Sequence, residues 1–105
     1  MPASSAKFAV GQVVHHKLFD YRGVIVDVDP VFALSDEWYE SMALSRPPKD
    51  RPWYHVLRHG TALRTYVAER NLDPEPSGEP IAHPEIEVFF RGFEDGAYLP
   101  RSRGN

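Results

Sequence analysis

The pattern of apolar and polar positions predicts several short strands joined by turns. Its strongest segment is 21–30, where Val24, Val26 and Val28 fall on one face of a strand because side chains alternate across a sheet. Pro30 ends this segment, since proline has no N–H to donate to a sheet ladder. We therefore expect a short central strand here, with the other apolar segments as its partners.

Weaker patterns predict the remaining elements. Ser35 is a suitable helix N-cap, and Trp38 and Met42 are four residues apart, so they share one face of a short helix. Pro47 and the proline after it end that helix. The expected ranges are strands over 8–16, 52–58, 63–69 and 81–90, a hairpin loop over 59–62 and a helix over 36–44.

These elements predict a single domain across all 105 residues. Its core is expected over about 8–90, with an acidic, proline-rich linker at 73–80 and a loose C-terminal tail at 100–105. Four or five short strands with tight connections and one short helix indicate a mainly β fold, namely a small antiparallel barrel.

The charge of the chain limits the classes of partner. The formal net charge is −3, whereas domains that bind nucleic acid are usually strongly basic. The charge is also uneven: residues 46–70 hold six basic residues against two acidic ones, and the segment from Asp73 onward holds three arginines against seven acidic residues. Solvated surface explains such an asymmetry, and contact with an anion or phosphate is the alternative.

Cysteine content and hydropathy indicate the setting. The chain has no cysteine, which excludes disulfides and thiolate metal sites and fits the cytoplasm. No apolar run approaches the ~20 residues that span a membrane, and the N-terminus lacks the apolar region of a signal peptide. We expect a soluble, cytoplasmic protein with no membrane contact.

Candidate chemistry is sparse. His55 and His59 are four apart, but along a strand this spacing covers about 13 Å, too far for two ligands of one zinc ion. Asp27 and Asp29 share a strand face about 6.6 Å apart, yet an acidic residue before Pro30 ordinarily forms a turn. The sequence therefore predicts no catalytic residue, no metal ligand and no cofactor, and a binding module in place of an enzyme.

Aromatic residues are the alternative source of function. The segment 52–58 places Trp53 on one face of a strand and Tyr54 on the other. One face lines the core, and the other needs cover from the helix over 36–44 or from another molecule. The residues predicted to contact a partner or a second copy are Trp38, Tyr39, Trp53 and Tyr54.

Several motifs resemble those of a known family. The clearest are Trp53-Tyr54-His55-Val56 and, downstream, Tyr66-Val67-Ala68-Glu69. Further matches lie, in the same order, within 8–16, 21–32, 71–72 and 83–84. The chain thus resembles, over about 8–90, the HspQ family, also called YccV-like or hemimethylated DNA-binding domain proteins.

The resemblance implies an SH3-like β-barrel, a cytoplasmic setting, association with heat shock, and a homo-oligomer, expected to be a trimer. It implies binding of hemimethylated DNA and, as the alternative, a protein-interaction adaptor that enhances the specificity of the Lon protease in the stress response. No catalytic motif comes with the family. The residues that we predict to contact DNA phosphates are Lys17, Arg22, Arg51, Arg58 and Arg64.

Overall fold

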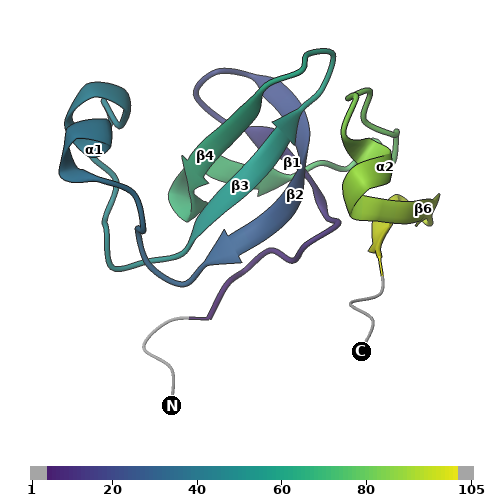
Figure 1. The fold of residues 1–105 in the computed structure, drawn as a ribbon, viewed down its shortest axis with the longest axis horizontal. Helices are drawn as coiled ribbons and strands as arrows, with labels where there is room; N and C mark the ends of the chain where they lie inside the picture. Colours follow the sequence, from purple (N-terminus) through teal and green to yellow (C-terminus); the bar gives the residue numbers. More distant parts are fainter. Residues whose placement is uncertain (1–4, 102–105) are drawn as a thin grey trace.

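The computed structural model describes residues 5–101, which form two β-sheets, two α-helices and one 3₁₀ turn. The main sheet lies in the middle, with α1 on one side and α2 and the second sheet on the other (Figure 1). In chain order the elements are β1 (Val13–His16), β2 (Tyr21–Asp29), α1 (Asp36–Met42), β3 (Trp53–Arg58), β4 (Arg64–Ala68), η1 (Glu69–Asn71), β5 (Leu72–Pro74), α2 (Ile86–Phe89), β6 (Phe90–Glu94) and β7 (Ala97–Pro100).

The main sheet has five strands in the order β4-β3-β2-β1-β5, and every neighbouring pair is antiparallel. The mainly β fold expected from the sequence is confirmed. Within residues 5–101 no ladder joins the two edge strands β4 and β5, so the sheet is not closed into a barrel. The SH3-like barrel therefore stays a prediction.

A β-bulge in β2 decides which side chains enter which core. The pairing of β2 with β3 shifts register between Ile25 and Asp27, so Val26 is the extra residue. Ile25 and Val28 consequently pack in one core, and Val26 packs in another. The expectation that Val28 shares a face with Val24 and Val26 is wrong, because the bulge shifts the alternation by one residue.

The chain itself covers both faces of β3. Tyr54 is fully buried on the inner face, where it packs with residues of β1, β2, β4 and β5. Trp53 is buried on the outer face, where it packs against Tyr39 of α1 and Ala43 just after it. Ser35 caps α1, since its hydroxyl oxygen accepts from the Trp38 N–H at 3.0 Å. The predicted helix is confirmed, and it supplies the internal cover.

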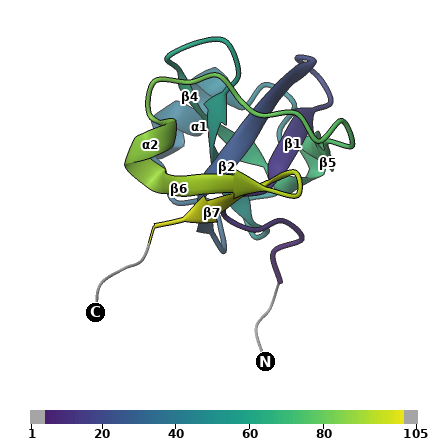
Figure 2. The same ribbon diagram turned by 90° about the vertical axis from the view of Figure 1, so that its right-hand side faces the viewer.

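The C-terminal segment covers the other part of the outer face. Figure 2 shows the β6–β7 hairpin lying across β2, with α2 at its start. Phe90 and Tyr98 of this hairpin pack in one core with Val24 and Leu57 of the main sheet. The second sheet therefore packs against the main sheet in a shared core. It was not among the elements predicted from the sequence.

The strand expected over 81–90 is wrong. Ile86–Phe89 forms α2, and only Phe90 begins a strand. Ile86 and Phe89 are three apart and pack against the core, whereas Val88 between them is exposed. Ile86, Val88 and Phe90 alternate in the sequence as the residues of a strand would. In the structure Ile86 and Phe89 instead share one face of a helix turn.

The ends of the expected linker and tail are also more regular than predicted. Leu72–Pro74 forms β5 at the start of the linker expected over 73–80, and Pro74 is tolerated because an edge strand needs no N–H on its outer side. Pro100 belongs to β7, while residues 102–105 of the expected tail lie outside the described residues. No helix within residues 5–101 is long and apolar enough to cross a bilayer.

Gly11 fastens the C-terminal hairpin to the main sheet. Its N–H donates to the Ile25 carbonyl and its carbonyl accepts from the Tyr98 N–H, both at 2.8 Å. Its φ of +94° suits glycine, and a Cβ atom at this position would overlap the Tyr98 carbonyl oxygen. A side chain at this position would therefore displace the C-terminal hairpin from the main sheet.

We expect Gly11→Ala to lower the free energy of unfolding by about 3 kcal/mol, because the positive φ costs ~1–2 kcal/mol and the overlap adds ~1–3 kcal/mol. Gly60→Ala is the matched control: Gly60 has a φ of +77° but open space around it, so only about 1 kcal/mol should be lost. Urea denaturation measures both, and equal losses would show that the Tyr98 contact is not a constraint.

Candidate functional site

A groove runs beside β4, and we call it the seam groove because it lies where the sheet is not closed. It consists of two adjoining hollows of about 320 and 520 Å³. Six residues within the range 5–101 line both hollows, namely His16, Phe19, Trp38, Met42, Tyr66 and Val67.

One wall of the seam groove is the edge of β4. Every residue of Arg64–Ala68 lines one hollow or the other. Because successive side chains of a strand point to opposite faces, a groove that touches five consecutive residues follows the edge of the strand. The other walls come from Leu18 and Phe19 of the β1–β2 turn and from Met42 and Leu44 at the end of α1.

His16 builds the turn that carries Phe19. Its Nδ1 accepts hydrogen bonds from the backbone N–H groups of Leu18 and Phe19, both at 3.1 Å. The imidazole also stacks on the Phe19 ring at a centroid distance of 4.8 Å. Burial lowers the pKa of His16 below its usual 6.5, and the charges of His15 and Arg58 lower it further. The neutral ring with an unprotonated Nδ1 is thus the form that the turn requires.

The seam groove is bordered by exposed apolar side chains. Leu18, Phe19, Met42 and Leu44 are 57%, 67%, 62% and 76% exposed. Isolated apolar residues are common on protein surfaces, but four around one groove form a continuous patch, which is typical of a surface that contacts another molecule. This patch was not predicted from the sequence, because its members come from two connections and a helix end.

Two of the predicted cations lie at one end of the seam groove. Arg58 and Arg64 line the larger hollow. The Arg58 guanidinium carbon lies 4.5 Å from the centroid of the Tyr21 ring, and among residues 5–101 no carboxylate pairs with it. Arg64 pairs with Glu85 at 3.2 Å. Among the described residues none with an acidic side chain lines either hollow, so the groove is apolar with one cationic end.

Lys17 and Arg51 lie outside the seam groove. Lys17 is 3.7 Å from a carboxylate oxygen of Asp73, in an exposed ion pair. Arg51 is exposed and lines a separate hollow of about 210 Å³ together with Lys7 and Arg70. The five predicted cations therefore do not form one patch, and Lys7 and Arg70 are neighbours of Arg51 that the prediction missed.

Arg22 is bound to the linker that follows β5. Its guanidinium donates to the carbonyl oxygen of Glu79, and its Nε lies 3.9 Å from an oxygen of the Glu75 carboxylate. Only 21% of its side chain is exposed. Arg22 holds the linker against β2, so its guanidinium is not free for a DNA phosphate in this structure.

The predicted aromatic contacts are mostly interior. Trp38 is half-buried and lines both hollows of the seam groove. Trp53 lies beneath the smaller hollow but is only 1% exposed, and Tyr54 is fully buried. Tyr39 is buried with its hydroxyl donating to the Pro47 carbonyl at 2.6 Å. Their burial corrects the prediction for Tyr39, Trp53 and Tyr54, since internal packing needs all three.

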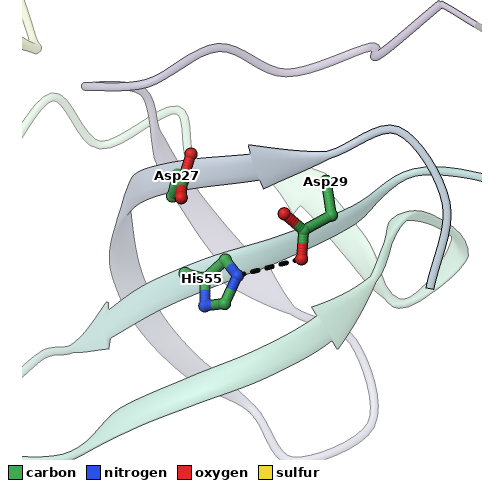
Figure 3. Close-up of side chains that lie close together, drawn as sticks. All are labelled: Asp27, Asp29 and His55. Atoms are coloured by element: carbon green, nitrogen blue, oxygen red, sulfur yellow. Dashed lines mark hydrogen bonds and ion pairs between the residues drawn. The ribbon is translucent and has the colours of Figure 1, made fainter. Parts of the chain in front are cut away.

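Three potential metal ligands meet on the outer face of the sheet. Asp27, Asp29 and His55 each place one donor atom within 4.8 Å of the others (Figure 3). The bulge in β2 brings both carboxylates to the side of His55. The shared face of Asp27 and Asp29 was predicted from the sequence, but the position of His55 beside them was not, because it depends on the register between two strands.

Hydrogen bonds account for the positions of Asp29 and His55 in this cluster. The Asp29 carboxylate accepts from the Tyr66 hydroxyl at 2.7 Å and contacts His55 Nε2 at 3.1 Å. Burial, and then this bond to Asp29, raise the pKa of the Tyr66 hydroxyl. Arg64 and Arg101 line the hollow beside Asp27, and their positive charge opposes a bound cation. We therefore regard the cluster as part of the packing around Tyr66.

The family model described as hemimethylated DNA-binding protein YccV like matches residues 6–97, which include the whole seam groove. The chain belongs to the YccV-like family. The resemblance drawn from the strand motifs is confirmed at this level.

Membership in the YccV-like family identifies no individual contact residue, so the five cations stay predictions. Within the YccV-like domain the structure favours Arg58, Arg64 and Arg51, which are accessible, over Arg22, which is bound to the linker. Lys17 is less favoured than these three because it forms an ion pair with Asp73.

The lowered pKa of His16 predicts a pH dependence of stability. Between the folded pKa and 6.5 the unfolded chain binds more protons at this residue, so its contribution is fully present above about pH 6.5 and is lost as the pH falls below that value. His16→Asn keeps an acceptor for the turn without a titrating ring. We expect urea denaturation between pH 7.5 and 5.5 to show a smaller loss of stability for the variant than for the wild type. Equal slopes would contradict this role.

Proposed function

We propose that this protein binds hemimethylated DNA, the activity by which its family is described. The observation that carries the proposal is Arg58, a half-buried residue whose guanidinium lies over the Tyr21 ring and has no ion-pair partner in residues 5–101. It lies beside apolar surface. Arginine contacts phosphate, and apolar side chains contact base methyl groups, so the two features together suit a methylated duplex.

The net charge of −3 predicts weak binding by one chain. We therefore propose that the protein acts as a homo-oligomer, with a trimer as the expected form, because linked weak sites bind more tightly than one. We also propose the cytoplasm as its location and the heat-shock response as its setting. These proposals rest on the resemblance to the HspQ family.

A protein-interaction adaptor is the second candidate function, and the apolar border of the seam groove favours it. Leu18, Phe19, Met42 and Leu44 offer a partner far more apolar than charged surface. An adaptor that enhances the specificity of the Lon protease, as the resemblance implies, would need such a surface for a protein ligand. Neither candidate needs bond breaking, so we propose a binding protein and not an enzyme.

We expect Arg58→Ala combined with Arg64→Ala to abolish the preference for hemimethylated duplex and to weaken binding of any duplex. The reason is the loss of two phosphate contacts, which should also lower the slope of log K against log salt by about 0.9 for each contact. Fluorescence anisotropy with labelled hemimethylated and unmethylated duplexes of the same sequence, titrated over a range of salt, measures both effects.

Arg91→Glu is the matched control, because it changes the net charge by the same two units on β6, away from the seam groove. It should leave the preference and most of the affinity intact. If the double variant binds like the control, the phosphate contacts lie elsewhere. If the wild type shows no preference and no salt dependence, the DNA function is wrong and the adaptor is left.

A further inference from the structure

The edge of β4 offers unpaired backbone groups to the seam groove. Two hydrogen bonds fix which groups these are: Arg58 N–H donates to the Leu63 carbonyl at 3.1 Å, and Glu69 N–H donates to the Pro52 carbonyl at 3.1 Å. Both bonds join residues directly opposite in the β3–β4 register, which continues the ladder beyond each end.

Hydrogen-bonded and non-bonded pairs alternate along an antiparallel ladder. Counting inward from the two bonds, Thr65 and Val67 direct their backbone groups toward β3. Arg64, Tyr66 and Ala68 therefore direct theirs away from it, toward the seam groove. Within residues 5–101, β4 pairs with no second strand, so this row is available to another chain.

The lining of the seam groove defines the chemistry of an occupant. Phe19, Trp38 and Met42 surround the space next to the β4 edge and suit apolar side chains. At one end, Arg58 has no ion-pair partner in the described part of the chain, and neither hollow contains a carboxylate. We therefore expect a ligand to carry an anionic group at that end, which would complement the charge of Arg58.

We propose that the seam groove binds an extended peptide of a partner protein, which adds as a strand to β4. Its alternate side chains would fill the apolar space between Phe19, Trp38 and Met42, and an acidic side chain would reach Arg58. Strand addition supplies affinity through main-chain hydrogen bonds and specificity through alternate side-chain pockets. The proposal deepens the adaptor function and does not depend on DNA binding.

A defined peptide tests this. The ligand is a fluorescein-labelled peptide of alternating leucine and serine that ends in two aspartates, and its counterpart ends in two lysines. We expect saturable binding in anisotropy titrations, with the aspartate peptide at least about tenfold tighter. Arg58→Ala should remove this preference while retaining residual binding of both peptides.

Backbone methylation separates strand addition from simple apolar contact. Two isomers of the aspartate peptide carry N-methyl groups on one or the other set of alternate amides. Only one set faces β4 in a strand pair, so one isomer should lose binding and the other should keep it. On binding of the unmodified peptide, amide hydrogen exchange should slow at Tyr66 and Ala68 and change little at Val67.

Substitutions locate the site on the protein. Phe19→Ser and Met42→Glu alter side chains that are 67% and 62% exposed, so the fold should tolerate both, and each should weaken the peptide at least about tenfold. Val88→Glu is the matched control, since Val88 is 66% exposed on α2, outside the seam groove, and should change nothing.

Several outcomes overturn the proposal. These are the absence of saturable binding at millimolar peptide, equal binding of the two N-methyl isomers, and equal effects of Met42→Glu and Val88→Glu. A wild-type dimer that Met42→Glu dissociates in sedimentation would show instead that a second copy occupies the groove. If the peptide binds as expected while duplex DNA does not bind, only the proposed DNA function fails.

Discussion

The close approach of β2 and β3 at Gly23 is the constraint on which the rest of the structure depends. A side chain at Gly23 would overlap Val56, and its Cβ would lie 2.7 Å from the Leu57 carbonyl oxygen, so only glycine allows this approach. The same register places Arg58 opposite Gly23, at the cationic end of the seam groove. The geometry that buries the centre of the sheet thus also positions the one groove cation that has no ion-pair partner among residues 5–101.

The bulge that follows in β2 changes which of its side chains face the core and which face outward. After Val26 the alternation reverses, so Asp27 and Asp29 leave the core and Val28 enters it. The outer face is then covered by α1 around Trp53 and by the C-terminal hairpin around Val24. A helix as short as α1 depends on such packing for its stability. The wall of the seam groove that α1 forms is therefore coupled to the Trp53 core.

Local patterns predicted the parts of this fold that local physics determines. The strand at β2, the cap at Ser35 and the paired aromatic strands follow from alternation, capping and turn chemistry. The bulge, α2 and the seam groove did not follow, because each depends on contacts between distant segments. Phe19 shows this: its exposure beside β4 depends on the bonds of His16 to its own turn and on the register of β4, and neither is visible in the residues around it.

An open edge strand is usually a liability, and proteins cover or charge such edges to prevent aggregation. Here the edge carries Arg64 and is partly sheltered by α1, but the apolar groove beside it stays accessible. Arg58 at the end of this groove has no ion-pair partner among residues 5–101, and covering such a charge without supplying a partner costs several kcal/mol. A ligand that covers Arg58 avoids this cost if it carries an anionic group, either a phosphate or a carboxylate. Because both would occupy the same guanidinium, DNA and an acidic peptide should exclude each other on one chain.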